Sequence, residues 1–164
     1  MDELLLDTTY LLPIFGVSAG LRKFEEAFGK LLNSYSVHYN PVSLMEAKWI
    51  VLRLGRTNSE KRNALLAAYR TGLNALASDR RLRATPLTSD TVEEVADGLL
   101  VREGVKDYFD RVIYGTAADR GCALLTEDEE LLKLKGKGEG PPTPSEVLTW
   151  KKVLSMWIAT SNRN

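Results

Sequence analysis

Two kinds of apolar segment alternate along the chain: short unbroken runs, and longer stretches with helical spacing. The unbroken runs are Leu4–Leu6 and Cys122–Leu125. A short continuous apolar run is typical of a strand buried on both faces, as in a parallel sheet. The stretch between Asp107 and Arg120 instead has helical spacing, and Gly121 supplies the left-handed residue that ends such a helix. The pattern therefore predicts an α/β fold, with the helix carried by Phe109, Val112, Ile113, Thr116 and Ala117.

The rest of the pattern adds two strands and several helices. Ser43 and Glu46 form an S-x-x-E capping box, which marks a helix start and is the structural alternative to a catalytic Glu46. Trp150 and Trp157 lie seven residues apart near one helix face, where they could close the core or form a dimer or partner surface. We expect strands at 36–39 and 84–87, helical segments at 11–16, 21–32, 43–54, 58–78, from 90 to 100 and from 143 onward, and a Gly, Pro and Lys loop at 133–143.

Acidic residues follow the carboxyl ends of the two buried runs. Asp7 directly follows the first run, and Asp128 closes the segment Thr126-Glu127-Asp128 after the second. In a parallel sheet these ends share one edge, and open α/β sheets place their ligand sites there. Asp110, near the start of the preceding helix, and Glu46 are further candidates. Two or more acids at one edge indicate a metal site.

The chain carries four short segments in a fixed order: LDTT at 6–9, SLME at 43–46, DRVIYGTA at 110–117 and LLTED at 124–128. In their order and rough spacing they resemble a PIN domain, and in particular the VapC-like toxin ribonucleases of prokaryotic toxin–antitoxin pairs. The resemblance implies a three-layer α/β/α sandwich around a mainly parallel sheet of short strands, in one nuclease domain over residues 1–164. It also implies an acidic pocket of Asp7, Glu46, Asp110 and Asp128, with Thr126 and either Thr8 or Thr9 hydrogen-bonded within it.

Two positions depart from the family pattern. Glu127 stands where these proteins often carry a basic or polar residue, which leaves open whether Glu127 or Asp128 is the ligand. Asp107 lies one turn before Asp110 and could share or replace its role.

Clustered carboxylates repel one another, so a hard divalent cation is expected to collect them. Mg²⁺ and Mn²⁺ prefer oxygen ligands, lower the pKa of a bound water and neutralise charge on a phosphodiester. We expect Asp7, Asp110 and Asp128 to form the metal site, with Asp7 and Asp128 as direct ligands. Asp110 and Glu46 would hold metal-bound waters or position the nucleophile. The resemblance further implies an RNA substrate, a small antitoxin partner and a homodimer.

Composition sets limits on these expectations. A chain of 164 residues suits one domain with a real core. Lys plus Arg equals Asp plus Glu at 22 each, so any affinity for RNA must come from local basic patches such as Arg80–Arg83. One cysteine excludes an intramolecular disulfide and is compatible with the cytoplasm. We expect neither a secretory signal nor a membrane span.

Other chemistries fit the sequence less well. His38 is the single histidine, so a Ser-His-Asp triad or a pair with Cys122 has one possible base, and Cys122 lies in an apolar run typical of a core residue. A phospho-receiver module would need an acid pair after its first strand and a lysine after its last. The remaining alternative to a nuclease is a catalytically quiet PIN-like module that binds RNA or protein.

Overall fold

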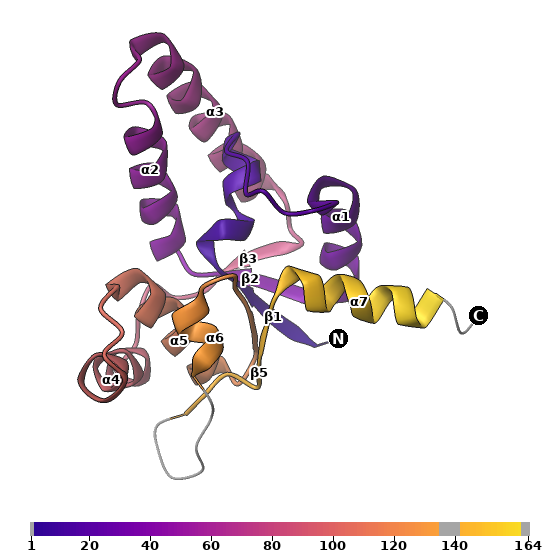
Figure 1. Cartoon of the computed structure of the whole chain (residues 1–164), viewed down its shortest axis with the longest axis vertical. Coiled ribbons are helices and arrows are strands. Elements are labelled where there is room, and N and C mark those ends of the chain that lie inside the picture. Colours follow the sequence, from indigo (N-terminus) through magenta and orange to yellow (C-terminus); the bar gives the residue numbers. More distant parts are fainter. Residues whose placement is uncertain (1, 135–141, 162–164) are drawn as a thin grey trace.

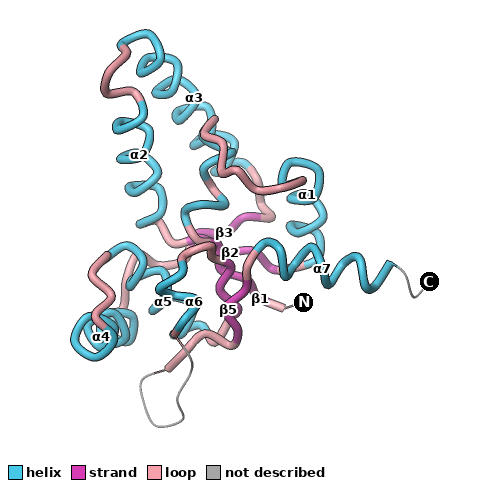
Figure 2. The backbone as a smooth tube through the Cα atoms, viewed as in Figure 1, coloured by secondary structure: helices cyan, strands magenta, loops and turns pink. Residues whose placement is uncertain are grey.

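A five-stranded, wholly parallel sheet lies at the centre of the fold, in the order β3-β2-β1-β4-β5. The computed structural model describes residues 2–134 and 142–161, and Figures 1 and 2 show helices on both sides of the sheet. The strands are β1 (Glu3–Leu6), β2 (Ser36–Tyr39), β3 (Leu82–Ala84), β4 (Ala123–Leu125) and β5 (Glu146–Leu148).

Helices of three kinds connect these strands. No helix in the described part of the chain is long and apolar enough to cross a membrane. The expected helical segment at 11–16 is made of 3₁₀ turns. The 3₁₀ helices are η1 (Thr8–Tyr10) and η2 (Leu12–Phe15), the π-helix is η3 (Leu99–Glu103), and the α-helices are α1 (Phe24–Ser34), α2 (Val42–Leu54), α3 (Ser59–Ser78), α4 (Asp90–Gly98), α5 (Tyr108–Arg120), α6 (Glu129–Lys133) and α7 (Trp150–Ser161).

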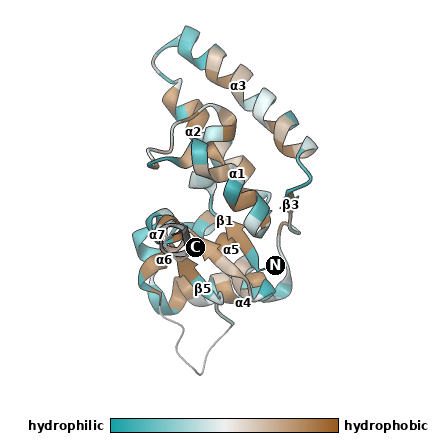
Figure 3. Cartoon of the chain, turned by 90° about the vertical axis from the view of Figure 1, so that its right-hand side faces the viewer, coloured by the Kyte–Doolittle hydropathy of each residue, from teal (hydrophilic) through white to brown (hydrophobic). Residues whose placement is uncertain are grey.

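Neighbouring residues of the central strands belong to different cores because side chains alternate between the faces of a strand. Leu4 and Leu6 pack in one core with residues of α1, α2, α3 and α7. Leu5 and Leu124 pack in a second core with residues of α4, α5 and α6. The three-layer α/β/α arrangement expected from the sequence is therefore confirmed. Figure 1 also shows α2 and α3 projecting beyond the sheet as a hairpin, and its tip is hydrophilic (teal) in Figure 3.

The direction of the connections reverses between β1 and β4. The chain passes from β1 to β2 on one side, and from β4 to β5 on the other. A crevice at the carboxyl ends of two such strands is the usual ligand site of an open α/β sheet. Asp7 follows β1 and Asp128 follows β4 after two intervening residues, so both lie at this reversal. The expected shared edge is confirmed.

Three boundaries differ from those expected. The third strand covers 82–84 rather than 84–87, because Pro86 has no N–H for a strand ladder. Residues 146–148 form the edge strand β5, in which Val147 pairs with Leu124, and the last helix starts only at Trp150. Leu100 is 43% exposed rather than part of the apolar stripe, because the π-helix that begins at Leu99 changes the helical period.

Asn40 joins several elements beneath the carboxyl edge of the sheet. Its side chain is fully buried and donates to the carbonyl of Leu87 (2.9 Å) and to Thr116 Oγ1 (2.8 Å). Its Oδ1 accepts from the backbone N–H of Val42 (2.8 Å), at the first residue of α2. One amide thus links β2, α2, α5 and the segment after β3.

Replacing Asn40 with alanine should strongly destabilise the protein. The substitution leaves several buried polar groups without partners, so we expect the free energy of unfolding to fall by about 2–4 kcal/mol. Urea denaturation measures this loss, and Asn63→Ala, at an exposed position of α3, is the matched control with a change within about 0.5 kcal/mol. Equal midpoints for the two variants would contradict the role assigned to Asn40.

Candidate active site

Asp7 is the buried acid at the sheet edge, with 5% of its surface exposed. The Asp7 N–H donates to the carbonyl of Leu125 (3.0 Å), which extends the β1–β4 pairing by one residue. Its carboxylate accepts from the Thr8 N–H and from Thr126 Oγ1 (2.7 Å). The hydroxyl of Thr126 also accepts from the N–H of Asp128 (3.0 Å), so one buried threonine joins two of the predicted site residues.

Glu46 reaches the same edge from α2. Its carboxylate accepts from the Thr8 hydroxyl (2.5 Å), and Thr8 is the residue after Asp7. The expected capping box is absent: α2 begins at Val42 with no side-chain cap, and Ser43 Oγ is buried without a hydrogen-bond partner among the described residues. The capping interpretation of Glu46 is therefore wrong, and its side chain faces the acidic residues.

Asp107 and Asp110 approach from the start of α5. Asp107 caps this helix by accepting from the Phe109 N–H (2.8 Å) and, at 3.4 Å, from the Asp110 N–H. This cap gives Asp107 a structural role, while its charge still acts on Asp110 and Glu46. Asp110 is half-buried.

Asp128 and Glu127 point to different partners. Asp128 caps α6 through Oδ1, which accepts from the Leu131 N–H (2.9 Å). Glu127 Oε1 accepts instead from the Tyr10 hydroxyl (2.6 Å) and from the Trp150 N–H (2.7 Å). Glu127 thus ties the end of β4 to α7, which favours Asp128 as the acid of the site.

Asp7, Glu46, Asp110 and Asp128 are close enough for the charge of one to raise the pKa of another. Burial raises the pKa of Asp7 to about 6, and the charges of Glu46 and Asp128 add to the rise. Burial raises the pKa of Asp110 to about 8, with further contributions from Asp7, Asp107, Asp128 and Glu46. Burial likewise raises the pKa of Glu46, together with the charges of Asp107 and Asp128. Without a cation, Asp110 therefore holds a proton at neutral pH.

The donor set suits a hard divalent cation. Every donor is a carboxylate oxygen or a threonine hydroxyl, as Mg²⁺ and Mn²⁺ prefer. Among the described side chains, no group of three His, Cys, Asp or Glu residues is close enough to form a preformed metal cage. Mg²⁺ rarely needs one, because it keeps several waters and is usually held by one or two carboxylates. The residues therefore fit a water-rich magnesium or manganese site.

The nucleophile alternatives find little support. Burial raises the pKa of the Cys122 thiol to about 11, so it is protonated at neutral pH. His38 is a buried strand residue whose Nε2 lies 3.2 Å from the hydroxyl of Ser36, and burial lowers its pKa. No hydrogen bond joins His38 and Cys122 within the described ranges. Cys122 is a core residue, as expected.

The sequence profile of the PIN domain matches residues 4–137, which is most of the chain. The chain belongs to the PIN domain family. PIN domains are generally nucleases and typically use divalent metal ions. No curated protein sequence matches this PIN domain protein.

Two solved structures share the fold. One is a chain of the VapBC2 complex from Rickettsia felis, which was crystallised with a DNA fragment from its promoter. It has a TM-score of 0.60 and 14% identity, over 90% of this chain and 98% of that chain. The other is PAE2754 from Pyrobaculum aerophilum, with a TM-score of 0.61 and 16% identity, over 96% of each chain. At such low identity these likenesses show the PIN fold alone.

The sequence did not predict the buried hydrogen bonds of Asn40 or those that Glu127 accepts from Tyr10 and Trp150. The signal for Asn40 was its place directly after a predicted strand and before Pro41, where an Asn side chain often caps the next element. Nothing local to Glu127 predicted its partners, because Tyr10 and Trp150 lie far from it in sequence.

Proposed function

We propose that this protein is a metal-dependent endoribonuclease that hydrolyses RNA phosphodiester bonds, within one nuclease domain over residues 1–164. The observation that carries the proposal is the mutual charge coupling of Asp7, Glu46, Asp110 and Asp128 at the β1–β4 reversal. Buried or half-buried carboxylates are costly unless a ligand or a reaction uses them. A divalent cation would compensate the charge of these acids at one edge, and a phosphodiester would be the group it acts on.

In this proposal Asp7 and Asp128 are the direct ligands of Mg²⁺ or Mn²⁺. The ion lowers the pKa of bound water and neutralises charge that develops on the phosphate. Thr126 orients both ligands, since its hydroxyl donates to Asp7 and accepts from the Asp128 N–H. Glu46, held by Thr8, and Asp110 would hold metal-bound waters or position the nucleophile.

We further propose that the protein is the toxin of a toxin–antitoxin pair in the cytoplasm, and that it forms a homodimer. Support comes from the PIN family and from the shared fold with a chain of the VapBC2 complex. A small antitoxin would inhibit the nuclease by covering the acidic edge. Co-expression with the product of a neighbouring small gene, followed by size-exclusion chromatography, tests this part separately.

Divalent ions should be required for RNA cleavage. We expect purified protein to fragment total RNA with Mg²⁺ or Mn²⁺, and expect cleavage to fall to background in excess EDTA, because uncompensated carboxylates repel the phosphate. Gel electrophoresis of the RNA measures the result, and restored activity after ion addition excludes damage by the chelator. Equal cleavage with and without ions would refute the proposal. Absence of cleavage under all conditions would favour the catalytically quiet module.

A further inference from the structure

A groove of about 810 Å³ lies between α1 and α7, outside the acidic site. Figure 1 shows these two helices next to each other. The floor of the groove includes Leu154 and the half-buried Trp157, which give it a nonpolar surface. Its rim carries four exposed cations, Arg22, Lys23, Lys30 and Lys151.

The four rim cations form no ion pair in the described part of the chain. Neighbouring Lys152 pairs with Glu146, and Arg81, in the densest basic cluster of the sequence, pairs with Asp79 at 2.8 Å. Of the two acids that line the groove, Glu127 is already engaged by two hydrogen bonds. The groove therefore presents a net positive rim.

The groove begins next to the acidic site. Glu127 lines it and lies between Thr126 and Asp128 in the chain. The Trp150 N–H binds Glu127, and this bond fixes the first residue of α7, one wall of the groove, to the end of β4. The lining of the groove therefore reaches the chain neighbour of Asp128.

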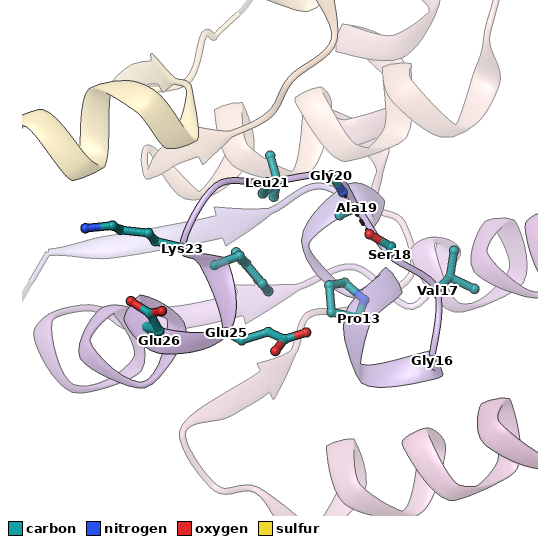
Figure 4. A pocket seen from close by; sticks show the side chains of 11 residues that line it. Pro13, Gly16, Val17, Ser18, Ala19, Gly20, Leu21, Lys23, Glu25 and Glu26 are labelled. Atoms are coloured by element: carbon teal, nitrogen blue, oxygen red, sulfur yellow. Dashed lines mark hydrogen bonds between the residues drawn. The ribbon is translucent and has the colours of Figure 1, made fainter.

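The other wall is held in an unusual conformation. Lys23 is the one non-glycine residue with a positive φ (56°) among the described residues, a conformation that costs roughly 1–2 kcal/mol. Trp150 Nε1 donates to the carbonyl of Arg22 (2.8 Å) and so anchors this turn to α7. Figure 4, which shows the adjoining hollow of about 510 Å³, shows the Lys23 side chain extending away from Pro13 and Val17, on the side where α7 lies.

We infer that this groove binds the single-stranded RNA segment adjacent to the scissile phosphate, an inference that rests on the proposed nuclease function. Lysine and arginine side chains along the rim contact phosphates, and the nonpolar floor receives bases, as in other single-strand grooves. Lys30 lies over the Trp157 ring at 5.0 Å, which places a cation and an aromatic surface together at the far end. Trp150 to Trp157 spans about 10 Å of helix. That length accepts about three stacked nucleotides at roughly 3.4 Å each.

The test measures RNA binding apart from cleavage. A fluorescein-labelled single-stranded 12-nucleotide RNA is titrated with Asp7→Asn protein in EDTA, by fluorescence anisotropy, between 50 and 200 mM KCl. Adding Lys30→Gln and Lys151→Gln together should weaken binding about tenfold at low salt. The slope of log K against log salt should fall by about 1.4, since each phosphate contact contributes roughly 0.7 for single strands. Lys152→Gln is the control: it removes one charge at the residue after Lys151, outside the groove lining, and should leave both quantities unchanged.

The outcomes separate the groove from the nuclease. If the double variant bound RNA with unchanged affinity and an unchanged salt slope, the inference that the groove binds RNA would be wrong, even if the wild type cleaves RNA. If the protein bound RNA in a salt-dependent way and the double variant lost this binding, the result would support RNA binding in the groove, even if no RNA is cleaved. Binding of poly-L-glutamate with no binding of RNA would also overturn the inference, since the rim would then serve an acidic protein segment.

Discussion

Asp7→Asn should reduce RNA cleavage by more than about 100-fold while leaving the protein folded. Changes to residues that only support a metal ligand already cost roughly 10- to 100-fold, and Asp7 is proposed as a ligand. Asparagine keeps the shape of the side chain and an acceptor for the Thr8 N–H. It removes the charge that burial disfavours. Initial rates on a labelled RNA, together with a urea denaturation curve, measure both effects.

The matched control for this prediction is Asp97→Asn. Asp97 is an exposed residue of α4, so the same chemical change there should leave cleavage within about twofold of wild type. If Asp7→Asn also kept wild-type activity, Asp7 would not be a ligand. If it unfolded the protein, Asp128→Asn would carry the test instead, with the same expected loss.

Asp110→Asn should stabilise the metal-free protein at pH 8 and flatten the dependence of its stability on pH. The folded pKa of Asp110 is about 8, above the ordinary value of 3.8, because of burial and the neighbouring acids. Between pH 4 and pH 8 the folded state therefore holds a proton that the unfolded chain has released. The contribution of Asp110 to stability is fully present below pH 4 and is lost as the pH rises through this window. Asparagine does not titrate, so the variant lacks this contribution to the fall.

We expect a gain of about 1–2 kcal/mol at pH 8, after allowing for solvent screening of this half-exposed group. Little gain is expected at pH 4.5. Urea denaturation in EDTA at both pH values measures the difference, with Asp97→Asn as the control. A wild type and an Asp110→Asn variant with parallel stability curves would contradict the proposed charge coupling.

Buried regular segments were the most predictable part of the fold. Leu4–Leu6 and Cys122–Leu125 contain no polar residue, so the local pattern predicts a buried strand and the tertiary packing requires one. The pattern failed at edges and ends. Glu146–Leu148 is too short for its pattern to indicate a strand, and its structure depends on pairing with β4, a contact that local sequence does not encode. Pro86 was a usable signal for the end of β3.

The acids of the site could be predicted where they directly follow a strand that the sequence pattern identifies. Asp7 and Asp128 follow strands that the pattern identifies, so their shared edge could be inferred. Glu46 was harder, because S-x-x-E predicts a capping box by local rules, whereas Thr8, 38 residues away in sequence, holds its carboxylate. The ligand roles of these residues remain predictions.

The central claim is that acids from distant segments together bind one kind of divalent ion. Titration of metal-free wild type with Mn²⁺, followed by electron paramagnetic resonance of the free ion, tests it most directly. We predict saturable binding by the wild type, at least a tenfold weaker affinity for Asp7→Asn and for Asp128→Asn, and no change for Asp97→Asn. Identical Mn²⁺ binding curves for the wild type and both site variants would contradict the claim.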